Sequence, residues 1–539
     1  MNDFLKAAMN VSETWNGALS YATTNSVCVD QFGKAGSCRG RDMDEVFAEQ
    51  AALWTANKEF AVKFPFYLRM ITRKTKMSDG STTETPQRGQ GARDEAFKRL
   101  LWFAHNESDI FYQNLWILPV VGSWKDLWVL LTMDDSLDQR KVFSVIAEGC
   151  QNDSQRDLVK KYLPQIRANS KCKTDWAQKT NDLAKAFCKF AGWTAQEYRM
   201  FKSTGKAHEF QRFISQGLYD RLDWNKISGK ALLNLATSHF LANHNLTDEY
   251  LDWISTTPTA KFNGYPYELG MKMKSLIYNT SVNGKIAKMT MDAQFENLIK
   301  TAKEGTGGIT GNVWCALDTS GSMAARISTS SELSAYDVCV SLGIYFSTLN
   351  EGVFHKNVIM FDNTSRVKQL TGTFSEMYSD IAKSSTAWGG TNFQSIVDEI
   401  VRIRKTRPYI SLSDYPTTIL VVSDMQFNPA TSWNDRYSTE MTNYEAMKEK
   451  LSRVFPKEFV DSMKFVWWQV NGKNVKDMPA TLDDGGCYFF SGFDGSLITM
   501  LLGGENQVVD KTTGEKRTPT MEELMEIAMN QDVLKLVKF

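Results

Sequence analysis

The hydrophobic periodicity of the sequence changes once, near residue 305, and this change limits the folds that the chain can adopt. From about residue 40 to residue 300, apolar residues recur at three- and four-residue spacings, as in "DEAFKRLLWFAH" and "DLAKAFCKFAGW". Such spacing predicts a succession of amphipathic helices. After the glycine-rich stretch "KEGTGGITGN" (303–312), short continuous apolar runs alternate with helical patterns. The sequence therefore predicts an all-helical region followed by an α/β region.

We place the domain boundary at this glycine-rich stretch, because 539 residues exceed what a single core can hold. Residues 1–305 are then a helical domain, in which helix pairs without strands predict a HEAT-like repeat, either open or closed into a ring. Residues 306–539 are a doubly wound α/β domain that ends in a helix starting near Thr518. Its expected buried strands are "VWCAL" at 313, "NVIMF" at 357, "TTILVV" at 417, "KFVWWQV" at 464 and "CYFF" at 487.

Composition excludes several classes of protein. The chain has 62 basic and 62 acidic residues, so its overall charge gives no reason to expect a nucleic-acid or membrane partner. The eight cysteines and five histidines are scattered, which argues against a disulfide framework and a zinc site. No run approaches the ~20 apolar residues of a membrane-spanning helix, and the N-terminus lacks a signal-peptide pattern. We expect a cytoplasmic protein, or a virion protein if a phage encodes it.

Acidic and hydroxyl side chains follow the predicted strands. Asp318, Ser320 and Ser322 come directly after the first strand in "DTSGSM", Thr391 precedes a helix in "WGGTNF", and Asp424 ends a strand in "VVSDMQF". Ligands of open α/β sheets bind at the carboxyl ends of the strands. Oxygen ligands without imidazole or thiolate suit Mg²⁺ or Mn²⁺. Because three of the ligands are neutral hydroxyls, the bound ion would attract an anionic oxygen from an acidic partner.

These five residues, in this order, resemble the metal-ion-dependent adhesion site of the von Willebrand factor A domain. The resemblance implies that Asp318, Ser320, Ser322, Thr391 and Asp424 hold the ion and that a partner completes its coordination. The alternative is a domain of the same kind that keeps the loop for its turn geometry and binds no metal. We expect no catalysis, since no histidine or lysine lies nearby in the sequence to activate a serine.

A second resemblance covers nearly the whole chain. Stretches such as "TWNGALSYATTNSVCVDQFG" (14–33), "VGSWKDLWVLL" (121–131) and "PATLDDGGCYFFSGFDGSLITMLLGG" (479–504) are similar to TROVE, or Ro-type, proteins. The similarity is greater to an uncharacterised family of TROVE relatives in bacteria, phages and plants. The resemblance implies a helical ring with an A domain, which binds the ends of misfolded RNAs in its hole and small structured RNAs on its outer face. The chain departs from the family at Gln90 and Ala92, in a glycine-rich basic stretch.

One helical segment carries a local excess of positive charge. Residues 156–206 contain twelve basic and four acidic residues, with Trp176, Phe187 and Trp193 among them. Lysine and arginine can bind phosphates while aromatic rings stack on unpaired bases. The alternative is that the aromatic residues belong to the core and the lysines to an ordinary solvated surface. The candidate RNA-binding residues are Lys160, Lys161, Arg167, Lys171, Lys173 and Lys179.

Together these patterns predict a non-enzymatic RNA-binding scaffold of the Ro type, with a divalent-metal adhesion site for an acidic partner. The competing hypothesis is a protein-adhesion or assembly component without an RNA role, such as a phage structural or host-factor-binding protein. A role as an adaptor for an ATPase is a third hypothesis. The stretch "GTGGITGN" lacks the Lys-Ser/Thr pair of a phosphate-binding loop, so the chain itself is not expected to bind ATP there.

Overall fold

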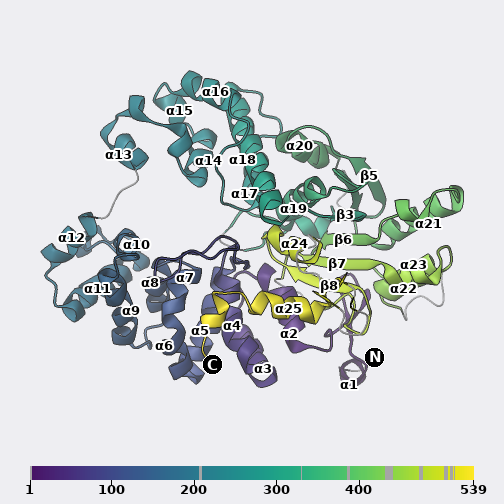
Figure 1. Cartoon of the computed structure of the whole chain (residues 1–539), viewed down its shortest axis with the longest axis horizontal. Coiled ribbons are helices and arrows are strands. Elements are labelled where there is room, and N and C mark those ends of the chain that lie inside the picture. Colours follow the sequence, from purple (N-terminus) through teal and green to yellow (C-terminus); the bar gives the residue numbers. More distant parts are fainter. Residues whose placement is uncertain are drawn as a thin grey trace. The chain divides into compact units, whose positions relative to one another are not determined.

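The chain divides into two compact units, each built from segments that are distant in the sequence. Unit 1 comprises Met1–Gly40 and Asp223–Glu526, and unit 2 comprises Arg41–Leu222 and Ile527–Phe539. Figure 1 shows the helices and strands of the computed structural model. The structure describes residues 3–204, 209–306, 308–328, 331–384, 389–430, 441–472, 477–502, 508–509, 514 and 516–539.

Unit 1 is organised around a six-stranded sheet with the order β5-β4-β3-β6-β7-β8 (Figure 1). All five predicted strands are present and pair in parallel with one another. The strand β5 was not predicted, because its sequence "SRVKQ" is polar and only partly buried, and it pairs antiparallel to β4 at the sheet edge. The strands are β3 Val313–Asp318, β4 Asn357–Phe361, β5 Ser365–Gln369, β6 Thr418–Ser423, β7 Lys464–Gln469 and β8 Cys487–Ser491.

The helix α19 (Ala335–Leu349) packs directly on the central strand β3. A Cβ atom at Gly343 would lie 2.3 Å from Leu317 Cδ2, so only glycine allows this approach. The other helices of the sheet region are α20 Phe374–Ser384, α21 Gln394–Thr406, α22 Asn443–Ser452, α23 Lys457–Ser462 and α24 Ile498–Leu502. A short hairpin is formed by β9 Val508–Val509 and β10 Lys516–Arg517.

Five helices that the sequence assigned to the helical domain belong to unit 1 instead. Lys274 Nζ lies 3.1 Å from Asp337 Oδ2 on α19, and Gly270 approaches Ser341 so closely that a Cβ atom there would lie 2.0 Å from its Oγ. The predicted boundary between residues 305 and 306 therefore does not coincide with the division into units. These helices are α14 Gly229–Thr237, α15 Phe240–Asn243, α16 Thr247–Ser255, α17 Pro266–Met273 and α18 Val282–Thr306.

The N-terminal segment also packs on the sheet of unit 1. Gly36 N donates a hydrogen bond to Ser491 Oγ at 3.1 Å, and Tyr21 N donates to Met478 O at 3.0 Å. This pairing joins residues more than 450 positions apart, which hydrophobic periodicity cannot reveal. The segment contains α1 Asp3–Ala8, β1 Val11–Glu13, β2 Leu19–Tyr21 and α2 Val27–Lys34.

Unit 2 is helical, as predicted, while the HEAT-like repeat and its closure into a ring stay predictions. Its interior includes an ionic cluster in which fully buried Arg99 lies 2.8 Å from Glu95 and 2.9 Å from Glu49. Its helices are α3 Met43–Ala56, α4 Lys58–Arg69, α5 Arg93–Asn106, α6 Ser108–Asn114, α7 Leu118–Val121, α8 Lys125–Met133, α9 Gln139–Gln151, α10 Arg156–Tyr162, α11 Asp175–Ala191, α12 Ala195–Ser203 and α13 Glu209–Gln216.

The end of the chain returns to unit 2. Gln531 Nε2 donates to Arg88 O at 2.9 Å, and Lys538 N donates to Asn114 Oδ1 at 2.7 Å. The predicted C-terminal helix is α25, Met521–Met529, which begins after Thr520 because that residue and Glu523 exchange hydrogen bonds. Within the described residues, no helix has the length and apolar character needed to cross a membrane.

Candidate functional site

Two of the predicted metal ligands end adjacent parallel strands. Asp318 is the last residue of β3, and Asp424 directly follows β6, whose residue Val422 pairs with Leu317. Both carboxylates therefore lie at the same edge of the sheet. Asp318 is fully buried and Asp424 is 4% exposed. The prediction that these residues share the carboxyl edge of the sheet is confirmed.

The two carboxyl groups are acceptors of hydrogen bonds that hold them in place. It is electrostatically unfavourable for both of them to be charged. Asp318 Oδ1 accepts from Ser320 N at 2.9 Å, and Asp318 Oδ2 accepts from Ser423 Oγ at 2.5 Å. Burial and the nearby charge of Asp424 raise the pKa of Asp318 to about 7. Burial also raises the pKa of Asp424, although its hydrogen bond from Ser322 opposes the shift. A cation between them would remove this penalty.

The three predicted hydroxyl ligands lie on loops that meet at the same place. Ser320 Oγ and Ser322 Oγ are 3.1 Å apart, and the bond from Ser322 to Asp424 links the first loop to the end of β6. Thr391 is 1% exposed, and its Oγ1 is buried without a hydrogen-bond partner among the described residues. An unpartnered buried hydroxyl costs free energy. We call Asp318, Ser320, Ser322, Thr391 and Asp424 the rim site.

Backbone hydrogen bonds fasten these loops together. Gly321 N donates to Gly389 O at 3.1 Å, and Asn428 N donates to Thr391 O at 2.8 Å. The Asn428 side chain accepts from Thr391 N at 3.1 Å. Gly390 lies close to the Asn428 side chain, since a Cβ atom there would lie 2.5 Å from Asn428 Nδ2. Sequence reasoning identified the glycines before Thr391 but not Asn428, which orients the threonine from another loop.

Oxygen atoms alone make up the rim site, and this fits a hard divalent cation. Its two carboxylates can balance the charge of one Mg²⁺ or Mn²⁺ ion, and the unpartnered Thr391 Oγ1 is a free donor of an electron pair. No described part of the chain gathers three or more His, Cys, Asp or Glu side chains in a metal-binding arrangement. A third acid at this edge, Asp362, follows β4 but already lies 2.6 Å from Arg366 Nη2, so it is neutralised.

The six predicted RNA-binding residues differ in exposure and in their partners. Lys160 is 9% exposed, with its Nζ 4.9 Å from the centre of the Phe201 ring and 3.8 Å from Asp157. Lys179 lies 3.4 Å from Asp135. Lys171 and Lys173 are exposed near the short helix before α11. Two of the six, Lys161 and Arg167, line a pocket.

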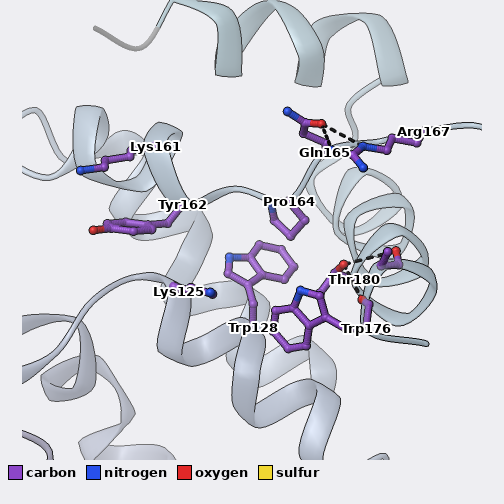
Figure 2. Close-up of a pocket in the computed structure, with 10 residues that line it drawn as sticks. Lys125, Trp128, Lys161, Tyr162, Pro164, Gln165, Arg167, Trp176 and Thr180 are labelled. Carbon is purple, nitrogen blue, oxygen red and sulfur yellow. Dashed lines mark hydrogen bonds between the residues drawn. The ribbon is translucent and has the colours of Figure 1, made fainter. Parts of the chain in front are cut away.

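This pocket, of about 310 Å³, lies within unit 2 between α8, α10, α11 and the segment that joins α10 to α11 (Figure 2). We call it the basic pocket. In Figure 2, Lys161 and Arg167 lie on opposite sides of it, with the indoles of Trp128 and Trp176 between them. Its lining is Lys125, Trp128, Lys161, Tyr162, Pro164, Gln165, Arg167, Trp176, Ala177 and Thr180.

Three cations and no carboxylate line the basic pocket. In the described part of the chain, no ion pair involves Lys125, Lys161 or Arg167. Lys125 Nζ lies 5.6 Å from the centre of the Trp176 ring, and Lys161 Nζ lies 5.4 Å from that of Tyr162. The pocket therefore combines unpaired positive charge with aromatic rings.

The aromatic residues of the basic segment divide between core and surface. Phe187 is fully buried and lies 5.9 Å from both Trp128 and Trp193, ring centre to ring centre. Trp176 is 42% exposed. Sequence reasoning missed Lys125 because it precedes the basic segment by about 30 residues, and only the packing of α8 on α11 brings it to Trp176.

Comparison with known proteins finds two similarities. A domain family of unknown function, DUF7788, matches residues 313–537. The chain is also 22% identical over 537 residues to an uncharacterised protein, L728, of Acanthamoeba polyphaga mimivirus, an alignment that covers 92% of this chain and 85% of the relative. The region similar to DUF7788 starts at the first residue of β3 and includes the whole rim site, whereas the basic pocket lies outside it.

Proposed function

We propose that the chain is a non-enzymatic binding scaffold whose rim site holds one Mg²⁺ or Mn²⁺ ion and, through it, an acidic protein partner. The observation that carries the proposal is the pair of buried carboxylates at one sheet edge, together with a buried threonine hydroxyl that has no partner among the described residues and lies on a loop hydrogen-bonded to the loop after β3. The resemblance to the adhesion site of von Willebrand factor A domains supports it.

Each residue of the rim site has a distinct part in this proposal. Asp318 and Asp424 supply the negative charge, with Asp318 fixed by Ser320 N and Ser423 Oγ. Ser320, Ser322 and Thr391 supply neutral oxygen atoms. A bound ion offers a carboxylate of the partner a coordination position, because neutral ligands leave part of its charge unbalanced. Ser322 is exposed, so the partner approaches the ion from its side.

Two matched threonines test the proposal. Thr391→Val should lower the affinity for Mg²⁺ about tenfold, measured by calorimetry, because it removes one ligand. It should not destabilise the metal-free protein, since the lost hydroxyl has no hydrogen bond to lose. Thr319→Val is the control: its Oγ1 donates to Phe361 O at 3.1 Å, in the same region. That variant should lose about 1 kcal/mol of stability and keep its affinity for the ion.

Equal Mg²⁺ affinity in the wild-type protein and in Thr391→Val would show that Thr391 is not a ligand of the ion. If the wild-type protein binds neither Mg²⁺ nor Mn²⁺ at millimolar concentration, the rim site serves only to fix the turn, and the adhesion function is wrong.

RNA binding by unit 2 is the second candidate function, and the basic pocket is the observation that favours it. Exposed Lys171 and Lys173 could extend the contact beyond the pocket. For single-stranded RNA, log K should fall by about 0.7 for each phosphate contact as log[salt] rises. Fluorescence anisotropy with a ten-nucleotide RNA between 50 and 200 mM salt, a range in which each such contact is measurable, tests this. Absence of binding at micromolar protein would favour the assembly role without RNA.

A further inference from the structure

We infer that the basic pocket is a subsite for one unpaired nucleotide, with the base stacked on Trp176 and the adjoining phosphates held by Lys125, Lys161 and Arg167. This inference rests on the second candidate function, RNA binding by unit 2. It specifies which part of the RNA is recognised, namely a single flipped-out or terminal nucleotide. It also adds Lys125, a cation outside the basic segment, to the RNA-binding residues.

The aromatic part of the site comes from the start of α11. Thr174 caps this helix by accepting from Ala177 N at 3.1 Å, and this fixes the first turn, in which Trp176 lies. Trp176 is 42% exposed, whereas Trp128, which also lines the pocket, is 1% exposed and packs on Phe187. Trp128 thus supports the pocket, and Trp176 is available for stacking on a base.

Two of the three cations lie close to aromatic rings of the pocket. Lys125 Nζ lies beside the Trp176 ring, and Lys161 Nζ lies beside Tyr162, so each ring has a positive charge within 6 Å. Arg167 is oriented by Gln165, whose Oε1 accepts from Arg167 Nε at 2.9 Å. The backbone of this segment is anchored as well, since Arg167 N donates to Asn181 Oδ1 at 2.8 Å.

Size and chemistry together favour a nucleotide over other anions. A volume of about 310 Å³ accepts one nucleotide-sized group and excludes a folded helix of RNA. A phosphorylated peptide would use the cations but leave the Trp176 ring without a flat partner. A base supplies that partner and brings a phosphate on each side, which matches cations on opposite sides of the pocket (Figure 2).

The first test compares two triple variants with the same change in charge. Lys125, Lys161 and Arg167 are changed to Gln in one, and exposed Lys58, Lys141 and Lys189, which do not line the pocket and are not among the candidate RNA-binding residues, are changed to Gln in the other. The probe is a fluorescent ten-nucleotide oligouridylate, measured by anisotropy with the full chain. The pocket triple should weaken binding at least tenfold and reduce the salt slope by about two. The control triple should weaken it less than threefold.

The second test isolates stacking. Trp176→Ala should weaken binding of the same oligonucleotide about tenfold, and Trp176→Phe, which keeps a ring, much less. The control is Phe190→Ala, which removes a ring of similar exposure, 40%, from the same helix but outside the pocket. A 5-iodouracil oligonucleotide should crosslink to Trp176, as located by mass spectrometry. Thermal unfolding confirms that each variant is folded.

Three results would overturn the inference while leaving RNA binding by unit 2 intact: equal losses in the two triple variants, no loss in Trp176→Ala, or crosslinks confined to other residues. A phosphoserine peptide that competes as well as the oligonucleotide would replace the nucleotide with a phosphopeptide as ligand. Failure of the wild-type chain to bind the oligonucleotide at micromolar concentration would overturn both the inference and the second candidate function.

Discussion

The rim site of unit 1 and the basic pocket of unit 2, our two proposed ligand sites, differ in charge and in burial. The rim site is negative, and four of its five residues are at most 4% exposed, with the carboxylate oxygens of Asp318 fixed by hydrogen bonds from Ser320 and Ser423. The basic pocket is positive, and its lysines and arginine are exposed on long side chains. We expect binding at the rim site to depend on the positions of fixed oxygen atoms, and binding at the basic pocket to depend on its positive charge.

This difference predicts how each site responds to change. In a buried site with a low dielectric constant, charges interact strongly and salt screens them little. The binding energy then resides in a few atoms, and the empty site destabilises the fold. In an exposed pocket each cation contributes a small, salt-dependent share. A single substitution of a charged ligand should therefore abolish ion binding at the rim site, whereas each substitution at the basic pocket should weaken RNA binding by a small amount.

The largest expected effect is at Asp318. Asp318→Asn should abolish Mg²⁺ binding, a loss of at least 100-fold by calorimetry, because one of two charged ligands is removed. In the metal-free protein at pH 8 the same change should raise the unfolding temperature, since an uncharged amide replaces a buried carboxylate whose pKa is raised to about 7. Asp424→Ala should also weaken Mg²⁺ binding, because it removes the other carboxylate of the rim site.

Asp362 is the matched control for this prediction. It also follows a buried strand and is 1% exposed, but Arg366 neutralises it. Asp362→Asn should leave Mg²⁺ affinity within about twofold and lower stability by about 1–2 kcal/mol, because the arginine loses its charged partner. Similar losses of Mg²⁺ affinity in the two variants would show that the general charge of the sheet edge, and not the rim site, attracts the ion.

The second prediction concerns pH. The folded protein holds a proton on Asp318 up to about pH 7, whereas the unfolded chain releases it near the ordinary value of 3.8. Between pH 4 and pH 7 the folded state therefore binds more protons, and stability falls as pH rises, by about 3 kcal/mol between pH 5 and pH 8. Urea unfolding of unit 1 in EDTA at pH 5 and pH 8 measures this difference.

Two controls sharpen the pH test. Saturating Mg²⁺ should remove the loss of stability at pH 8, because the ion takes the place of the proton. Asp318→Asn in EDTA should have a flatter pH profile than the wild-type protein. If the stability of the wild-type protein in EDTA rises from pH 5 to pH 8, the proposed electrostatic repulsion between the two buried carboxylates is contradicted.

The sequence allowed us to predict the sheet edge at which Asp318 and Asp424 lie, but not the basic pocket, for a physical reason. Asp318 and Asp424 end strands whose apolar runs are visible in the sequence, and parallel strands bring such ends to one edge. Lys125 joins the pocket only through the packing of helices, which no local pattern encodes. The same reason explains the missed edge strand β5 and the unforeseen place of Met1–Gly40 in unit 1.

The third prediction asks whether the two sites act independently. Ser320→Ala combined with Ser322→Ala should weaken Mn²⁺ binding about tenfold or more and leave the affinity for the oligouridylate unchanged. The pocket triple variant should do the reverse. Both affinities can be measured on the same preparations, by electron paramagnetic resonance for the ion and anisotropy for RNA. If both variants lose affinity for both the ion and the RNA, the two sites are coupled and do not act independently.

The smallest expected effect separates two neighbouring lysines. Lys160 is 9% exposed, and its ammonium lies over the Phe201 ring, so Lys160→Gln should cost about 1 kcal/mol of stability and leave RNA affinity nearly unchanged. Lys161 is exposed at the basic pocket, so Lys161→Gln should weaken oligouridylate binding two- to threefold and leave stability unchanged. Both substitutions remove one positive charge from adjacent positions, so long-range electrostatics cannot distinguish them. A larger loss of RNA affinity in Lys160→Gln than in Lys161→Gln would place the RNA on the α12 side of α10 and away from the basic pocket.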